Sequence, residues 1–301
     1  MNPAGPGART INELWWLMFG VATFVVLLVG GLVFTAIVRR RAPDPRLSPP
    51  WARRLIYGGG VVFPLVVLAA LWVLVLHDIG ALSDPGTQRL TVDVIGHQWW
   101  WEVRYPQQGV VTANDVHIPV GLPVELRLST ADVLHSFWVP ELTGKTDMIA
   151  GRINHMTVEA SNAGVYRGQC AEFCGLQHAN MIFFVVAEPP ATFQQWLSRQ
   201  VQGPSPPTDP TLARGEQVFV NAACVACHAI KNTPANGTLG PDLSNIGGRL
   251  SIGAGAVPND TGNLAGWIID SQGIKPGNLM PRMQLPAQDL QALVAYLESL
   301  R

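Results

Sequence analysis

The sequence predicts a multidomain membrane protein made of a two-helix transmembrane hairpin, an all-β sandwich and an all-α domain. Three observations support this prediction: two uncharged apolar runs near the N-terminus, short β-forming runs after Gln88, and amphipathic helical patterns near the C-terminus. Hydrophobic residues make up 48% of the chain and charged residues only 14%, which indicates lipid-facing surface. The expected parts are the hairpin at residues 1–79, the sandwich at 80–200, a linker at 201–211 and the helical domain at 212–301.

The two apolar runs, residues 14–38 and 55–76, contain no charged residue. At about 1.5 Å rise per residue, each helix is long enough to span a hydrocarbon core of about 30 Å. The first run is too long for the apolar core of a signal peptide, so we expect two passes instead of a cleaved leader and one anchor. Gly58 to Gly60 and Pro64 in the second run predict a kink or close helix packing.

Arginines between the two runs predict the orientation of the hairpin. They are Arg39, Arg40, Arg41, Arg46, Arg53 and Arg54. The positive-inside bias places this loop in the cytoplasm, and both termini with everything after His77 on the outer side. The near balance of 20 Lys and Arg against 21 Asp and Glu gives the chain no global attraction to nucleic acid.

Short runs of β-forming residues, separated by Gly, Pro, Asn and Asp turns, predict a sandwich or barrel in the middle of the chain. The runs are residues 91–105, 116–130, 135–140, 152–160 and 181–188. A short helix around Trp196 is expected to close this unit. Residues 201–211 are rich in Pro, Ser, Thr and Gly and are typical of a linker. In the last predicted helix, one face carries Leu290, Leu293, Val294, Leu297 and Leu300.

The pentapeptide CVACH at residues 224–228 is typical of covalent c-type heme attachment. In this pattern Cys224 and Cys227 bond the heme vinyl groups, and His228 ligates the iron. The competing interpretations are a redox disulfide and half of a zinc site. Neither is favoured, because no second CxxC follows the histidine and no βαβ pattern surrounds the motif.

An electron-carrying heme needs a second axial ligand, and Met280 and Met283 are the only methionines after the motif. The stretches GPDLSNIGGR and IKPGNLMP resemble class I cytochromes c, in which the methionine before a proline ligates iron. This resemblance covers residues 211–301 and implies Met280 as the ligand, which leaves Met283 as a core residue. By the same resemblance, a backbone carbonyl that supports the histidine and two side chains near the heme are expected at Pro241, Trp267 and Arg249.

The stretch CAEFCGLQHANM, residues 170–181, offers Cys170, Cys174, His178 and Met181 as ligands in one loop. Thiolates and thioethers select soft redox-active ions such as copper, and imidazole suits copper as well. Zinc is the first competitor, but the methionine and the β-rich surroundings favour copper. A disulfide between the two cysteines is the other alternative.

The segments GHQWWWEVRY, DVLHSFWVPELTGKTDMIAGRIN and CAEFCGLQHANM, preceded by two spanning helices, resemble subunit II of heme-copper cytochrome c oxidases. In that family the sandwich is a cupredoxin, and its loop holds CuA, two copper ions bridged by both cysteine sulfurs. The resemblance implies that the bridging residues are Cys170 and Cys174, the capping ligands His135 and His178, the weak ligand Met181, and the backbone carbonyl ligand Glu172.

The same resemblance implies roles beyond the copper ligands. The Glu172 side chain would reach a magnesium ion at the contact with subunit I. Electrons would enter above CuA at Trp99, with Trp100 beside it where the family often has tyrosine; packing is the expected role of Trp100. Ala150 and Ala171 replace the usual proline and serine, but neither position supplies a metal-binding side chain. Structural roles without clustered partners are expected for His97, His117 and His155.

The attached cytochrome c domain points to subunit II of a caa3-type cytochrome c oxidase. Electrons would pass from an external donor, such as a cytochrome c or the bc1 complex, through heme c and CuA to heme a and the heme a3/CuB site in subunit I. The chain would work with subunits I and III in a bacterial cell membrane, with both soluble domains periplasmic. The alternatives are the electron-accepting subunit of a CuA-containing nitric oxide reductase and a non-catalytic membrane-anchored heme and copper sensor.

The linker suggests why donor and acceptor share one chain. Residues 212–301 carry six cations and six anions, whereas residues 80–200 carry seven cations and eleven anions. The heme domain therefore lacks the basic surface of a diffusing donor that is steered to an acidic dock. We hypothesise that the tether replaces this steering by holding the heme at an effective concentration on the order of millimolar.

Overall fold

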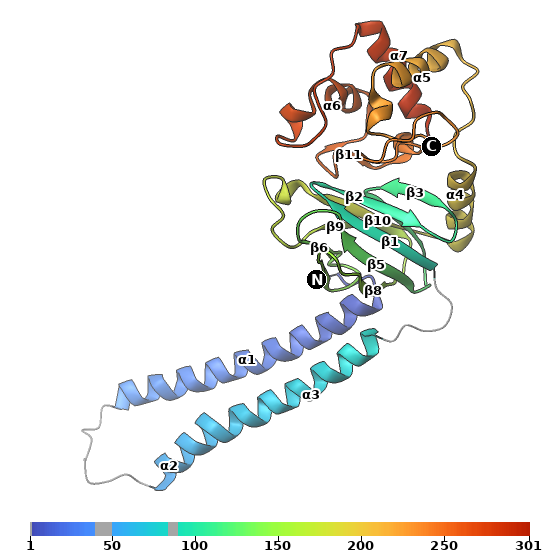
Figure 1. The fold of residues 1–301 in the computed structure, drawn as a ribbon. Coiled ribbons are helices and arrows are strands. Elements are labelled where there is room, and N and C mark those ends of the chain that lie inside the picture. Colours follow the sequence, from blue (N-terminus) through green and yellow to red (C-terminus); the bar gives the residue numbers. More distant parts are fainter. Residues whose placement is uncertain (1, 40–49, 84–89) are drawn as a thin grey trace. The chain divides into compact units, whose positions relative to one another are not determined.

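The computed structural model describes residues 2–39, 50–83 and 90–301 (Figure 1). The N-terminal part is helical, with α1 (Pro6–Arg39), α2 (Pro50–Tyr57), a π-helical turn η1 (Gly58–Val62) and α3 (Phe63–Ser83). Two stretches, Pro6–Arg39 and Pro50–Leu76, are long and apolar enough to cross a membrane, and none of their most apolar windows is buried. This confirms the two predicted apolar helices. Of the arginines used to predict orientation, Arg40, Arg41 and Arg46 lie outside the described residues.

The π-helical turn has a local cause in the sequence. Pro64 has no backbone N–H and therefore cannot bond to the carbonyl four residues before it. In η1 the N–H of Phe63 instead donates to the carbonyl of Gly58, one residue further back than in an α-helix. The glycine run permits this local widening, so the predicted irregularity takes the form of a π-turn.

The middle of the chain forms two five-stranded sheets, which confirms the predicted sandwich. The first sheet has the order β3 (Val110–Ala113), β2 (Trp100–Tyr105), β1 (Leu90–His97), β5 (Val124–Thr130) and β8 (Asn154–Val158). The second has the order β4 (Asp115–Pro119), β10 (Ile182–Glu188), β9 (Gly164–Cys170), β6 (His135–Trp138) and β7 (Lys145–Met148). The β-forming runs did not include β3, β7 and β9, although the alternating pattern GVYRGQC in β9 was a usable signal.

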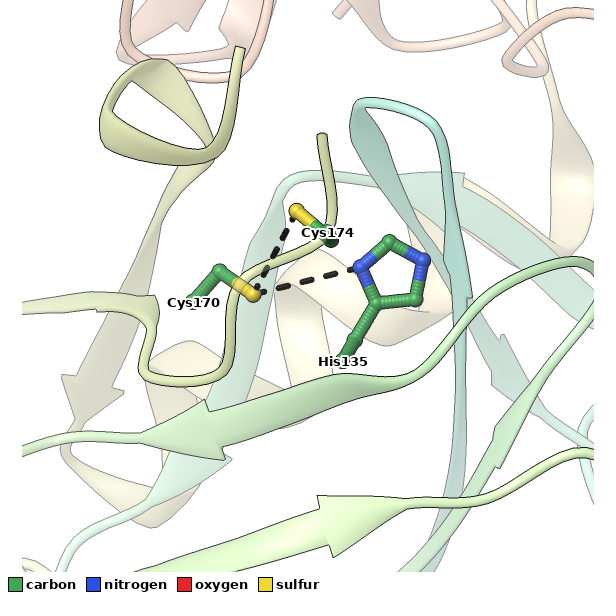
Figure 2. Close-up of side chains that lie close together, drawn as sticks. All are labelled: His135, Cys170 and Cys174. Atoms are coloured by element: carbon green, nitrogen blue, oxygen red, sulfur yellow. Dashed lines mark hydrogen bonds between the residues drawn. The ribbon is translucent and has the colours of Figure 1, made fainter. Parts of the chain in front are cut away.

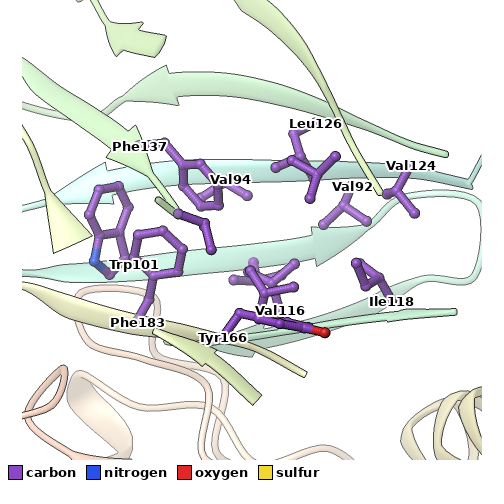
Figure 3. Close-up of a cluster of buried hydrophobic side chains, with 14 of the residues drawn as sticks. Val92, Val94, Trp101, Val116, Ile118, Val124, Leu126, Phe137, Tyr166 and Phe183 are labelled. Carbon is purple, nitrogen blue, oxygen red and sulfur yellow. The ribbon is translucent and has the colours of Figure 1, made fainter. Parts of the chain in front are cut away.

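The core of the sandwich is built from inward-facing residues of both sheets (Figure 3). Alternation along β1 buries Val92 and Val94, while Trp101 enters the same core from β2. The Trp101 ring meets Phe137 of β6 edge-on at 5.9 Å and Phe183 of β10 at 4.9 Å between ring centroids. This aromatic cluster therefore ties together the strand ends that carry the predicted copper ligands.

Replacing Trp101 with alanine should lower the free energy of unfolding by about 3–5 kcal/mol, because it removes a fully buried aromatic side chain and leaves a cavity. Chemical denaturation of the detergent-solubilised chain, followed by circular dichroism, would measure the loss. The control is Leu122→Ala at an exposed turn position, where a much smaller change is expected. An unchanged denaturation midpoint for the Trp101 variant would contradict the packing role.

Helix α4 (Pro190–Gln202) contains Trp196, and the C-terminal part has short elements between helices α5 (Pro210–Asn221), α6 (Thr261–Ile274) and α7 (Ala287–Ser299). The short elements of the C-terminal part are η3 (Cys224–Ala226), η4 (Ile246–Gly248), β11 (Ser251–Ile252) and β12 (Val257–Pro258). One further short element, η2 (His178–Asn180), belongs to the sandwich. Helices α5 and α7 cross closely at Gly215, where a Cβ atom would lie 2.1 Å from the Ala292 carbonyl oxygen. The predicted face of α7 is confirmed, because Leu293, Val294, Leu297 and Leu300 are buried in this core.

Candidate copper and heme sites

The end of β9, the loop after it and the start of β6 bring the predicted copper ligands together. Cys170 is the last residue of β9, Cys174 follows in the loop, and His135 is the first residue of β6; all three are buried. The two Sγ atoms lie 3.7 Å apart, and Cys170 Sγ lies 3.9 Å from His135 Nδ1 (Figure 2). A disulfide bond is about 2.05 Å long, so these cysteines are free thiols.

The other three predicted ligands surround the same pair of sulfurs. His178 Nδ1 and Met181 Sδ each lie 3.7 Å from Cys174 Sγ, and the carbonyl oxygen of Glu172 lies 3.1 Å from Cys170 Sγ. One histidine therefore adjoins each cysteine. Two thiols, two imidazoles, a thioether and a carbonyl form a donor set that suits copper.

The two thiols differ in acidity because they share a hydrogen bond. This contact lowers the pKa of Cys170 and raises the pKa of Cys174, so the pair retains one proton between them. His135 Nδ1 also lies beside the Cys170 sulfur and favours its thiolate. Because a metal ion binds the thiolate form, copper would replace the remaining proton.

Asp132 positions the His135 ring, a role that the sequence interpretation missed. Its Oδ1 lies 2.8 Å from His135 Nε2, and the carboxylate accepts backbone N–H groups from Gln98 and Val133, each at 2.6 Å. Burial raises the pKa of Asp132, but these hydrogen bonds outweigh burial and lower it overall. Nε2–H is thereby directed to the carboxylate and Nδ1 toward the sulfurs. The aspartate three residues before the histidine was the signal that could have revealed this pair.

The variant Asp132→Asn should weaken copper binding by about 10–100-fold, the usual cost of losing a carboxylate behind a histidine ligand. Competition of the purified chain with a copper chelator would measure this change. The matched control is Glu125→Gln, which removes the carboxylate 2.9 Å from His155 Nδ1, away from the copper ligands. Equal affinities for wild type and the Asp132 variant would show that the carboxylate does not support the site.

Trp99 connects the β1–β2 turn to the copper loop. Its indole Nε1–H donates to the carbonyl of Cys174 at 3.0 Å, and Gln98 Nε2 donates to the same oxygen at 2.7 Å. Its neighbour Trp100 stacks on His97, with ring centroids 4.3 Å apart, in agreement with the expected packing role. The two tryptophans thus have different surroundings, and Trp99 is the one joined to a cysteine of the site.

A cavity of about 380 Å³ adjoins the CVACH motif. Its lining includes Cys224, Cys227 and His228. His228 Nδ1–H donates to the carbonyl of Pro241 at 2.8 Å, as expected from the resemblance, so Nε2 is the ring nitrogen left for iron. Burial lowers the pKa of His228, which favours the neutral imidazole needed by a metal. The residues present therefore fit a covalently bound heme.

Met280 and Met283 both line this cavity, but their surroundings differ. The Met280 carbonyl accepts hydrogen bonds from Ser271 Oγ at 2.8 Å and Gln272 Nε2 at 2.9 Å, and its N–H donates to Asn278 Oδ1 at 2.8 Å. Met283 instead packs against the helical core. These bonds hold the Met280 segment at the cavity through its backbone, and Met280 stays the predicted axial ligand. Two other residues of the predicted heme surroundings, Trp267 and Arg249, also line the cavity.

The strand histidines each have a carboxylate neighbour, which the sequence interpretation did not foresee. His97 Nε2 lies 2.9 Å from Glu102, and His117 Nδ1 lies 3.1 Å from Glu188. His155 likewise lies beside Glu125. These contacts agree with the structural roles expected for the three histidines. The Glu172 carboxylate lies 3.9 Å from Lys145 Nζ and is partly exposed.

Known protein families match both soluble parts of the chain. The family model for the periplasmic domain of cytochrome c oxidase subunit II matches residues 109–188, and the model for cytochrome c matches residues 212–301. The cytochrome c oxidase subunit 2 of Alkalihalophilus pseudofirmus (strain OF4) is 35% identical over 315 residues, covering 100% of this chain and 90% of the relative. This chain belongs to the cytochrome c oxidase subunit 2 family.

Another relative is the cytochrome c oxidase subunit 2 of Bacillus sp. (strain PS3), which is 35% identical over 254 residues, covering 79% of this chain and 71% of the relative. The solved periplasmic domain of subunit II from Bradyrhizobium japonicum is 27% identical, with a TM-score of 0.38, and the match covers 39% of this chain and 96% of that one.

The chain is thus a component of a respiratory oxidase, with a cupredoxin domain followed by a cytochrome c domain. The subunit 2 domain implies CuA copper, and the cytochrome c domain implies heme c. The two apolar helices agree with a membrane-anchored oxidase subunit.

Proposed function

We propose that this chain accepts electrons at a heme c held by Cys224, Cys227, His228 and Met280. It passes them through a binuclear CuA centre to heme a and the heme a3/CuB site of subunit I in aerobic respiration. The single observation that carries this proposal is Trp99, which lines the heme cavity and donates its indole N–H to the carbonyl of Cys174. One side chain thus borders both candidate redox sites.

The residues of the copper loop have separate roles in this proposal. Cys170 and Cys174 would hold the copper through their thiolates, His135 and His178 through their imidazoles, Met181 through its thioether as a weak ligand, and Glu172 through its backbone carbonyl. Bound copper and heme iron supply reversible one-electron chemistry. Both cysteines are buried away from water, and Asp132 holds the His135 ring in place. The side chains around the site therefore rearrange little when it gains or loses an electron.

The partners follow from the proposed direction of transfer. An external donor, such as a cytochrome c or the bc1 complex, reduces heme c, and subunits I and III complete the oxidase. Oxygen reduction takes place in subunit I. The Glu172 carboxylate shares a magnesium ion with subunit I, and the soluble domains lie on the periplasmic side of a bacterial cell membrane. The partly exposed carboxylate of Glu172 is available for such a contact.

Sustained turnover of the assembled complex tests the proposal. The oxidase containing this chain should consume oxygen continuously when supplied with reduced cytochrome c. Uptake of nitric oxide without comparable oxygen consumption would identify a nitric oxide reductase, and reduction of heme c without turnover would identify a sensor. Either result would reject the proposed function.

A further inference from the structure

The heme domain contacts the cupredoxin domain through hydrogen bonds between backbone and buried groups. The N–H of Ile182 in β10 donates to the carbonyl of Ala254 at 2.9 Å. The N–H of Leu250 donates to the carboxylate of Asp115 at 3.0 Å, and Asp115 is buried. Bonds of this kind require one relative placement of their partners, because a shifted domain would leave buried polar groups unpaired.

Lys275 of the heme domain donates two further hydrogen bonds to the cupredoxin domain. It follows α6 in the heme domain, and its side chain is only 2% exposed. Nζ donates to the carbonyls of Trp99 and Asn180 in the cupredoxin domain, both at 2.8 Å, and to the carbonyl of Gly253 in its own domain at 2.7 Å. An ammonium group has three donors, so this side chain is fully paired although it is removed from water.

The two carbonyls reached in the cupredoxin domain belong to segments that border the copper site. Trp99 is the residue whose indole N–H bonds to Cys174, and Asn180 precedes the predicted ligand Met181. Lys275 also lines the heme cavity. The residue after Lys275 also bonds to the copper loop, since Gln177 Nε2 donates to the carbonyl of Pro276 at 2.8 Å. The same ammonium therefore adjoins the heme cavity, the Trp99 turn and the copper loop.

We infer that Lys275 is a positioning residue that fixes the heme domain against Trp99 and the copper loop for electron transfer within the chain. This inference rests on the proposed function and extends the tether hypothesis. The linker keeps the domains close together, whereas the ammonium selects the arrangement in which the heme cavity faces Trp99. A tether alone would supply concentration without a fixed distance.

The test compares Lys275→Met with wild type in the assembled oxidase. The methionine side chain keeps a similar length but has no donor for the three carbonyls. Heme c reoxidation by CuA, followed by rapid-mixing spectroscopy, should slow on the order of tenfold or more, the factor that a charged hydrogen bond contributes to an equilibrium. The optical spectrum of heme c, the CuA signal and the KM for the external donor should stay at wild-type values.

Hydrogen exchange supplies a readout that does not depend on turnover. In Lys275→Met, the amides of residues 176–183 and 249–256 should exchange on the order of tenfold faster than in wild type. The matched control is Lys231→Met. Lys231 Nζ donates to the carbonyls of Gln200 and Val201 in α4, away from Trp99, the copper loop and the heme cavity, so neither the transfer rate nor the protection of these amides should change. Equal effects of both variants would overturn the inference, as would wild-type rates and protection in Lys275→Met.

Lys275→Arg decides the matter if the methionine variant fails to fold. The planar guanidinium cannot direct three donors from one nitrogen to three convergent carbonyls, so slower transfer and faster exchange are expected again. Wild-type behaviour of this variant would overturn the inference. If wild-type heme c did not reduce CuA at all, the proposed function would fail, whereas the exchange comparison would still decide whether Lys275 fixes the domains.

Discussion

Replacing Cys174 with serine is expected to remove copper from the protein and to stop electron flow from heme c to oxygen. Cys174 Sγ lies 3.7 Å from Cys170 Sγ, His178 Nδ1 and Met181 Sδ, so three predicted ligands would lose their shared neighbour. The loss in copper affinity should exceed the roughly 10–100-fold cost of changing a group behind a ligand. Metal analysis and heme c reoxidation kinetics of the assembled oxidase measure both effects.

Glu172→Gln is the matched control for the cysteine variant. The predicted copper contact of Glu172 is its backbone carbonyl, 3.1 Å from Cys170 Sγ, and this substitution leaves the carbonyl in place. Copper content should therefore remain at the wild-type level. A Cys174→Ser protein with full copper content and normal heme c reoxidation would show that this thiol does not bridge the metals.

The second large effect is expected at the heme. Met280→Leu removes the proposed thioether ligand, and because a methionine ligand raises the potential of heme iron, the potential should fall by on the order of 100 mV. For a one-electron couple, about 59 mV corresponds to a tenfold change in the reduction equilibrium, so the variant should be reduced roughly fiftyfold less favourably. Spectroelectrochemical titration of the purified chain measures this shift.

Met283→Leu provides the comparison, because Met283 packs with the helical core and leucine has a similar volume. Its heme potential and low-spin spectrum should stay close to wild type. If the two variants exchanged these behaviours, Met283 would be the ligand, and the sequence assignment from the methionine–proline pair would be wrong.

The candidate ligands could be predicted because most of them lie in short local patterns. Cys170, Cys174, His178 and Met181 occupy a single loop, and these soft ligands, with the predicted β-rich surroundings, favoured copper over zinc or a disulfide. His135 is distant in sequence and came from the family resemblance. Its convergence on the sulfurs depends on the pairing of β6 with β9, which places Phe137 opposite Cys170.

The contacts that hold the sites in place could not be predicted from local patterns. Lys275 bonds to Trp99 across 176 positions in sequence, and Asp132 accepts from Gln98 across 34. Such pairs carry no periodicity or motif, because they arise only when turns from separate strands and domains meet. The start of the first helix at Pro6, earlier than the predicted residue 14, has a similar cause. The first turn of this helix also bonds to a distant segment, since the N–H of Ala8 donates to the carbonyl of Leu142 at 3.0 Å.

The structure adds fixed contacts between the two domains to the predicted flexible tether. Sequence composition suggested a heme domain kept nearby by a flexible linker, with little charge steering. The cross-domain bonds of Lys275, Asp115 and Ile182 add a defined contact surface to that linker. Proximity and orientation then come from different parts of the chain, and variants of each part should separate them.

The most direct test of the central claim is combined metal analysis and electron paramagnetic resonance of the purified full-length chain. Two coppers for each heme iron, with a mixed-valence signal from a copper pair beside a low-spin c-type heme, are the expected result. Iron without copper, or Cys170 and Cys174 joined in a disulfide, would contradict it.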